Sequence, residues 1–186
     1  MLVTGVLLVF LRNWRAAVIV ASVIPLSLLF ALTVMDARGV SANLISLGTV
    51  DFGIIVDGAV VLVEALMVKL ALAEQRGGTQ NLTHRIDTLI ETAVEMVHPI
   101  LFSTAIIVFA FMPIYTFQRV EGKIFAPVAF TFSFAMLGAV ILTMTLVPAL
   151  AAFAVRGKGM AEKHSAWIEK LTARYRRLLE WAPAHR

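Results

Sequence analysis

Three carboxylic acids lie inside a stretch whose composition is otherwise that of a membrane-spanning helix. They are Asp51, Asp57 and Glu64, in the run Leu44–Leu72. A charged carboxylate at the centre of a bilayer helix costs about 2.5–3.5 kcal/mol. Three such acids would destabilise the helix if they faced lipid, so we expect them to face a bundle interior or a wet cavity. Acids in that position usually move protons or ions.

The spacing of the three acids predicts an ordered set along one helix. Asp57 and Glu64 are seven residues apart, so they are only about 20° out of alignment and about 10.5 Å apart along the axis. Asp51 is turned by about 120° from Asp57 and lies about 9 Å further toward the other end. Direct proton transfer is impossible over such distances, so water would have to bridge the acids. Asp57, near the middle of the run, is the hardest of the three to solvate when charged.

A cation to pair with Asp57 is missing from the predicted spans. Lys69 is the one Lys or Arg within them, and it stands at the edge of its run, where its long side chain can reach the interface. It is too far along the axis to pair with Asp57. We therefore expect the partner cation to come from polypeptide outside this chain.

The composition indicates a membrane protein. Of the 186 residues, 60% are hydrophobic and 15% charged, whereas soluble domains average about 45–50% apolar and about 25% charged residues. There are no cysteines, which excludes disulfides and thiolate metal sites. The net charge of +4 follows from basic residues that flank membrane spans. No nucleic-acid-binding motif accompanies that charge, and we expect no nucleic-acid partner.

The apolar runs predict an all-α, polytopic transmembrane bundle of about four and a half spans. Backbone groups in lipid must bond within a helix or a closed barrel, and these runs lack the alternation of barrel strands. The first run is shorter than the roughly 20 residues that a span needs, so we expect its beginning to lie outside the chain. The predicted spans are residues 1–11, 16–35, 44–72, 99–117 and 125–155.

The connections carry further predictions. Gly39 should break the chain within Asp36–Asn43, and Gln118–Lys123 should join the last two spans. Within Ala73–His98, a separate helix is expected from about Thr83. Basic residues flank the spans unevenly: all but three of the 16 Lys and Arg residues fall on one side, which the positive-inside rule makes cytoplasmic. The three exceptions are Arg38, Arg119 and Lys123.

The chain divides into a partial transmembrane domain, residues 1–157, and a basic amphipathic helix on the cytoplasmic side, residues 158–186. In the second part Trp167, Leu171 and Tyr175 share one helical face, while basic residues fall elsewhere. This pattern suits a membrane surface. The alternative is a soluble bundle helix.

Several stretches resemble a known family of transporters. The run SANLISLGTVDFGIIVDGAVVLVEA resembles the fourth membrane helix of resistance–nodulation–division (RND) efflux pumps, in particular their heavy-metal branch. LRNWRAAVIVASVIPLSLLFA resembles the junction of the second and third helices. HPILFSTAIIVFAFMPIYTFQRVEGKIFAPVAFTFSFAMLGAVILTMTLVPAL resembles the fifth and sixth. The resemblance therefore covers nearly the whole chain.

The resemblance implies roles for the three acids. The family's proton-relay acids fall on Asp51, Asp57 and Glu64, and Gly58 after Asp57 favours the metal branch over the multidrug branch. An acid at Asp51 favours export of divalent cations over copper or silver. The chain departs from the family pattern at Ala65, His98 and Arg119, none of which is a relay acid.

The same resemblance implies the setting of the protein. We expect a multi-pass protein of the bacterial inner (plasma) membrane that is part of a longer pump with a second helical half. Its partners would be the lipid bilayer, protons, further copies in a homotrimer, a periplasmic adaptor and an outer-membrane channel. The protein would be a secondary active transporter and not an enzyme, without a cofactor. No two histidines share metal-ligand spacing on a helix, so we assign no metal site.

Three alternatives stay open. The chain could be a non-transporting module, either truncated or structural, because the first run is short and the cation is missing. It could also belong to an RND pump for another substrate class. A passive proton or cation channel formed by oligomerisation is the third alternative.

Overall fold

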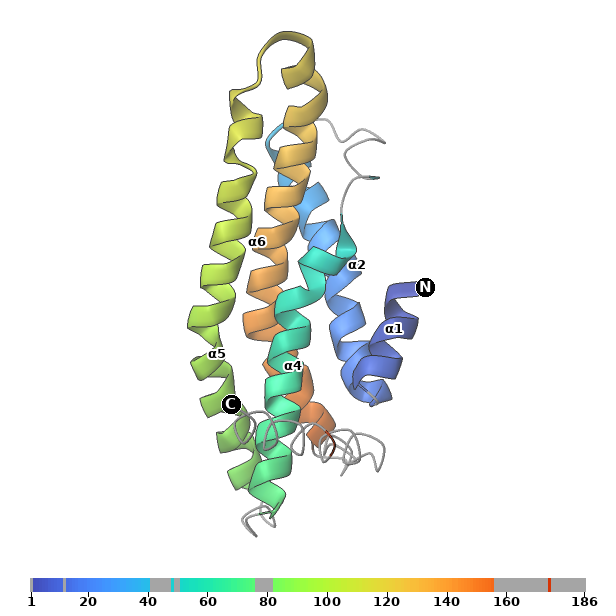
Figure 1. Ribbon diagram of the computed structural model, residues 1–186, viewed down its shortest axis with the longest axis vertical. Coiled ribbons are helices and arrows are strands. Elements are labelled where there is room, and N and C mark those ends of the chain that lie inside the picture. Colours follow the sequence, from blue (N-terminus) through green and yellow to red (C-terminus); the bar gives the residue numbers. More distant parts are fainter. Residues whose placement is uncertain are drawn as a thin grey trace, which may run out of the picture.

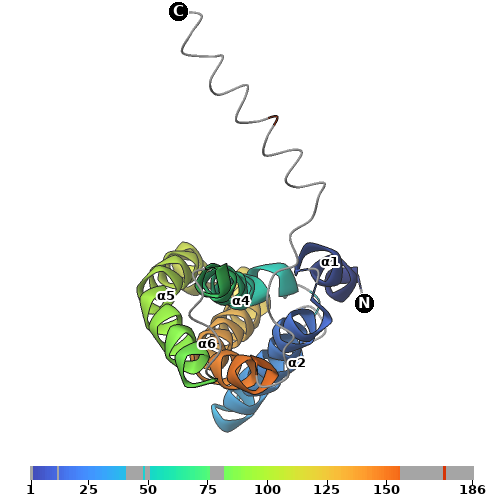
Figure 2. The same cartoon turned by 90° about the horizontal axis from the view of Figure 1, so that it is seen from below.

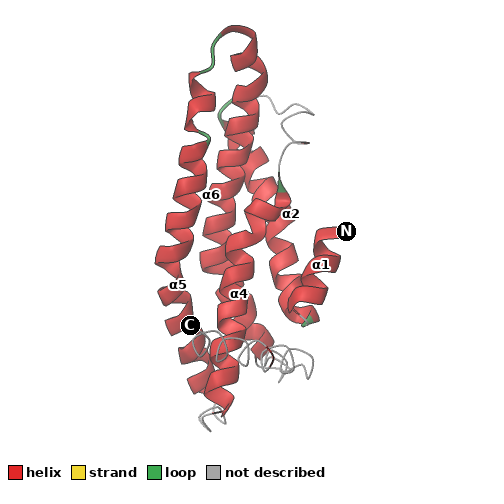
Figure 3. Cartoon of the chain, viewed as in Figure 1, coloured by secondary structure: helices red, strands yellow, loops and turns green. Residues whose placement is uncertain are grey.

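The computed structural model describes residues 2–11, 13–40, 51–75 and 82–155, together with the single positions 48 and 174. Every regular element in these residues is helical, which confirms the predicted all-α fold (Figure 3). The elements are α1 (Leu2–Leu11), α2 (Trp14–Ala37), α4 (Phe52–Gln75), α5 (Leu82–Ala110), the 3₁₀ helix η1 (Met112–Thr116) and α6 (Arg119–Val155).

The long helices run side by side, with α6 in contact with α2, α4, α5 and η1 (Figure 1). Figure 2 shows α4 and α5 along one side of the bundle and α2 and α6 along the other, with α1 beside α2. Three helical stretches are long and apolar enough to cross a membrane: Trp14–Ala37, Leu82–Thr116 and Arg119–Val155. The protein is therefore a multi-pass membrane protein.

The core is apolar and is assembled from helical stripes. On α4 the fully buried side chains include Ile55, Ala59, Leu62 and Leu66, which repeat at the spacing of one helical face. This face packs on α5, α6 and α2. Because one face of α4 is covered inside the bundle, the orientation of its opposite face is fixed as well.

Close packing joins α2 to α6 near the middle of both helices. A Cβ atom added to Gly138 of α6 would lie 2.6 Å from Cδ1 of Phe30 on α2, so glycine is what permits this approach. Further along, the Thr131 hydroxyl donates to the Met35 sulfur at 3.1 Å, and both residues are buried.

The end of α2 is a glycine-dependent cap. Gly39 has φ 65°, a backbone conformation that L side chains rarely adopt. The amides of Val40 and Gly39 donate to the carbonyls of Met35 and Asp36, which is the Schellman arrangement. The predicted break at Gly39 is therefore confirmed.

Several helix boundaries differ from the sequence expectations. α5 runs through Pro99 without a break, although a separate helix before this proline was expected. Partly or fully buried residues keep helical spacing across it, so packing on α4 and α6 outweighs the lost N–H donor of proline. α5 then ends at Ala110, and Pro113 lies in η1, in place of one helix to Phe117.

α6 begins at Arg119 and not near Phe125. Arg119 adopts φ 60°, and this left-handed residue turns the chain sharply after η1. The Gly122 amide then donates to the Gln118 carbonyl at 3.3 Å. A Cβ atom on Gly122 would collide with the Phe117 carbonyl. The residues predicted as a connection thus form the first turn of α6.

Candidate functional site

Asp57 and Glu64 lie together on the face of α4 that is turned away from the bundle. Both side chains are exposed, as are Val61 and Val68 between and beyond them. We call this stripe of Asp57, Val61, Glu64 and Val68 the acid face. The predicted alignment of Asp57 with Glu64 is reproduced, because seven residues make nearly two helical turns.

The acid face does not point into the interior formed by the described helices of this chain, whereas a bundle interior or a wet cavity was expected. The physical reason is the larger apolar stripe on the other side of α4, which is buried against α5, α6 and α2. Among the described residues, the other helices cover the opposite face of α4, so the acids would be enclosed by polypeptide that packs on its outside.

Asp57 lies at the level of the middle of α6. It borders a small cleft whose α6 walls include Met136, Val140 and Thr143, in a helix that spans Arg119–Val155. A helix of that length exceeds the roughly 20 residues that cross a membrane. α6 is thus long enough to cross a membrane, and Asp57 is level with its middle.

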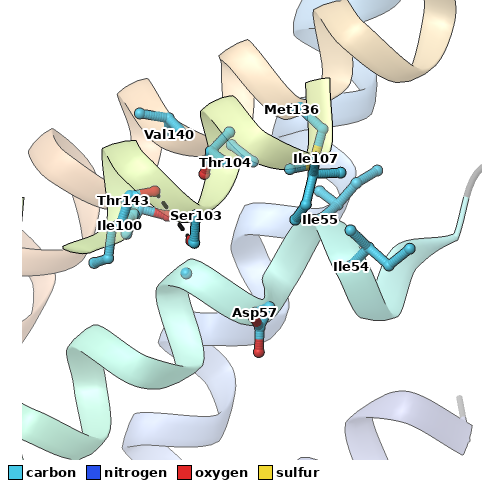
Figure 4. A pocket seen from close by; sticks show the side chains of 12 residues that line it. Ile54, Ile55, Asp57, Ile100, Ser103, Thr104, Ile107, Met136, Val140 and Thr143 are labelled. Atoms are coloured by element: carbon cyan, nitrogen blue, oxygen red, sulfur yellow. Dashed lines mark hydrogen bonds between the residues drawn. The ribbon is translucent and has the colours of Figure 1, made fainter. Parts of the chain in front are cut away.

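The cleft beside Asp57 has a volume of about 10 Å³, which is room for roughly one water molecule. Hydroxyl groups of Ser103, Thr104 and Thr143 border it, but the carboxylate of Asp57 is turned away from them (Figure 4). The Ser103 hydroxyl donates to the Ile100 carbonyl of its own helix at 3.2 Å. A Cβ atom on Gly58 would lie 3.1 Å from Ile100, so α4 and α5 are tightly packed here.

Asp51 has a structural role that the sequence analysis did not identify. It precedes the first residue of α4, and its Oδ1 accepts a hydrogen bond from the Gly53 amide at 2.8 Å. This is the geometry of a helix N-cap. An aspartate directly before an apolar helical run is a known signal for a helix start, but the apolar run here begins at Leu44, so Asp51 lies inside the predicted span. Residues 44–47 lie outside the described part.

The ion pairs of the described residues do not involve the three acids. Lys69 Nζ pairs with Glu95 Oε2 at 2.9 Å, and Arg85 pairs with Glu74 at 2.5 Å. Both pairs join the C-terminal part of α4 to the first half of α5. Within the described ranges, then, no Lys or Arg forms an ion pair with Asp57 or Glu64.

The basic residues mark one end of the bundle. Arg15 donates to the Ala154 carbonyl at 3.3 Å, which places the start of α2 beside the end of α6. The ends of α4 and α6 lie at the lower end of the bundle in Figure 1, whereas α6 begins at the upper end. This agrees with the alternation of sides that the charge pattern predicts. The basic helix expected within residues 158–186 falls outside the described residues, apart from Arg174.

A multi-pass helical bundle with an acid-bearing outer face is the class of protein that this geometry defines. The whole chain, residues 1–186, matches the model of the AcrB/AcrD/AcrF family, and the chain belongs to that family. This is the RND family whose resemblance was noted above.

Named relatives share this sequence closely. The chain is 44% identical over 184 residues to the nickel-cobalt-cadmium resistance protein NccA of Alcaligenes xylosoxydans xylosoxydans, covering 98% of this chain and 17% of that protein. It is 44% identical over 180 residues to the cobalt-zinc-cadmium resistance protein CzcA of Cupriavidus metallidurans, covering 96% and 17%. Identity to the cation efflux system protein CusA of Escherichia coli is 33% over 153 residues, covering 80% and 15%.

A solved structure agrees with the fold. The crystal structure of a heavy metal efflux pump matches with a TM-score of 0.67 and 41% identity, covering 82% of this chain and 14% of that one. The chain thus spans about one sixth of the length of the relatives it matches.

Proposed function

We propose that this chain is the proton-relay transmembrane portion of a proton-driven pump that exports divalent heavy-metal cations. The observation that carries the proposal is the acid face. Two carboxylates project from the outside of an apolar helix, one of them level with the middle of α6. Exposure of such groups to lipid is costly, so the face suits a second helical half that encloses it.

In this proposal Asp57 is the central proton carrier, Glu64 continues the path toward the basic end, and Asp51 lies at the opposite end. The cation that would pair with Asp57 comes from the second helical half. Proton binding to Asp57 removes its charge and weakens that pair, which lets the two halves move relative to each other. The export of metal would be coupled to this movement.

The metal class rests on the relatives. The two proteins that are 44% identical are named for resistance to nickel, cobalt, cadmium and zinc, all of which form divalent cations. The proposed setting is the bacterial inner membrane. There, the complete pump would form a homotrimer and dock with a periplasmic adaptor and an outer-membrane channel.

The test is Asp57→Asn in the complete polypeptide that carries this chain. Asparagine keeps the size of the side chain but cannot take up and release a proton at neutral pH. We expect cells with this variant to lose resistance to Ni²⁺, Co²⁺, Zn²⁺ and Cd²⁺ while the protein remains in the membrane at normal amounts.

The matched control is Asp36→Asn, which makes the same chemical change at an exposed position near the end of α2. It should leave resistance unchanged. Normal metal resistance in the Asp57→Asn cells would contradict the proposal and favour a non-transporting module or a pump that works without this acid.

A further inference from the structure

An apolar groove of about 670 Å³ opens between the start of α2 and the end of α6. We call it the α2–α6 groove. Its size lies within the range of about 300–1,000 Å³ that is usual for small-molecule sites. Its walls include Trp14, Val18 and Ile19 of α2 and Leu150 and Phe153 of α6.

The walls of the α2–α6 groove remain open to the surroundings. Val18 is 54% exposed and Phe153 is 73% exposed. Both helices that form it are long and apolar enough to cross a membrane. An apolar groove on a lipid-facing surface suits an acyl chain.

The mouth of the groove carries a fixed positive charge. The Arg15 guanidinium donates to the Ala154 carbonyl at 3.3 Å and lies 5.8 Å from the ring centroid of Trp14. Tryptophan is enriched at the height of lipid headgroups, and a planar guanidinium suits phosphate oxygens. Basic pockets between membrane helices on the cytoplasmic side are known to take anionic headgroups.

We infer that the α2–α6 groove is a binding site for one anionic phospholipid. Its phosphate lies at Arg15 and Trp14, and one acyl chain lies along Val18, Ile19 and Phe153. The groove is formed by residues of α2 and α6, whereas the acid face belongs to α4. Figure 2 shows how these three helices are arranged. The groove and the acid face thus belong to different helices.

The experiment is native mass spectrometry of the complete polypeptide, purified in detergent and titrated with phosphatidylglycerol or with phosphatidylethanolamine of the same acyl chains. A basic residue near a membrane surface contributes about 1 kcal/mol to the binding of an anionic lipid, which corresponds to about fivefold tighter binding. We expect the wild type to retain phosphatidylglycerol about fivefold better, and Arg15→Gln to lose this preference.

Two further variants separate the site from general effects. Lys69→Gln removes an equal charge at the same end but outside the groove, and it should keep the lipid preference. Val18→Trp fills the groove without changing its charge, and it should lower the retention of both lipids. Arg15→Lys keeps the charge and should keep the preference.

The inference is overturned if Arg15→Gln retains the wild-type preference, if Lys69→Gln loses as much as Arg15→Gln, or if Val18→Trp has no effect. Lipid retention is measured without transport, so this result is independent of whether the pump proposal holds.

Discussion

Asp51 combines a structural role with a proposed chemical one, and the two can be separated by substitution. Its Oδ1 caps α4 through the Gly53 amide. Asparagine caps a helix about as well as aspartate, whereas alanine does not. Asp51→Ala should therefore lower the free energy of unfolding by about 1 kcal/mol, and Asp51→Asn should leave it nearly unchanged, as measured by chemical denaturation.

Metal export by the Asp51→Asn variant then tests the carboxylate alone. If Asp51 carries protons, export should fall although stability is normal. Metal export at the wild-type level would show that Asp51 acts only as a helix cap. The proton path would then consist of Asp57 and Glu64.

Arg119 is the one described non-glycine residue with a positive φ. Left-handed backbone costs an L side chain roughly 1–2 kcal/mol, and glycine avoids that cost. We predict that Arg119→Gly raises the free energy of unfolding by up to about 1 kcal/mol, since the more flexible unfolded chain offsets part of the gain.

The control is Arg38→Gly. Arg38 has φ −95° at the end of α2, a conformation that arginine adopts without strain, so glycine should bring no gain there. Thermal unfolding of both variants measures the difference, and a loss of stability in Arg119→Gly would contradict the assigned turn.

At the scale of the helices, the contact between α2 and α6 depends on Gly138. Its added Cβ would lie 2.6 Å from a ring atom of Phe30 and 3.1 Å from the Phe30 Cβ, so the helices must separate or Phe30 must change its rotamer. Gly138→Ala should cost about 1–3 kcal/mol in stability, as overpacking usually does.

Gly5→Ala is the matched control, because an added Cβ at Gly5 meets nothing within 4 Å. In the double variant Gly138→Ala/Phe30→Ala, removing the ring should recover part of the lost stability, since neighbouring changes are coupled. If Gly138→Ala lowers the free energy of unfolding equally in the wild-type and the Phe30→Ala backgrounds, the contact with Phe30 is not the cause of the loss.

The sequence predicted the helices better than their ends. Apolar runs identified the helical segments, and Gly39 marked a true break. Pro99 led to the prediction of a break because proline lacks the backbone N–H that a helix needs, which is a local cost in stability. The burial of Leu89 and Ile100 on the same stripe of α5 offsets that cost through packing on other helices. The start of α6 at Arg119 depends on a strained backbone angle that residue type does not disclose.

At the scale of the molecule, helical periodicity correctly put Asp57 and Glu64 on one stripe. It could not predict that this stripe faces outward from the described helices. Helical periodicity shows which residues share a face, but it does not show which neighbouring helix covers that face. The described residues supply no ion-pair partner for these acids. This fits the membership of the chain in a family whose named members are about six times longer.

The central claim is that Asp57 couples proton movement to metal movement, and flux through the complete polypeptide in liposomes tests it most directly. A proton gradient is imposed, and proton entry is recorded with a pH-sensitive dye before and after the addition of Zn²⁺. We predict Zn²⁺-dependent proton flux in the wild type and in Asp36→Asn, and none above empty liposomes in Asp57→Asn. Zn²⁺-dependent flux at the wild-type rate in Asp57→Asn would contradict the claim.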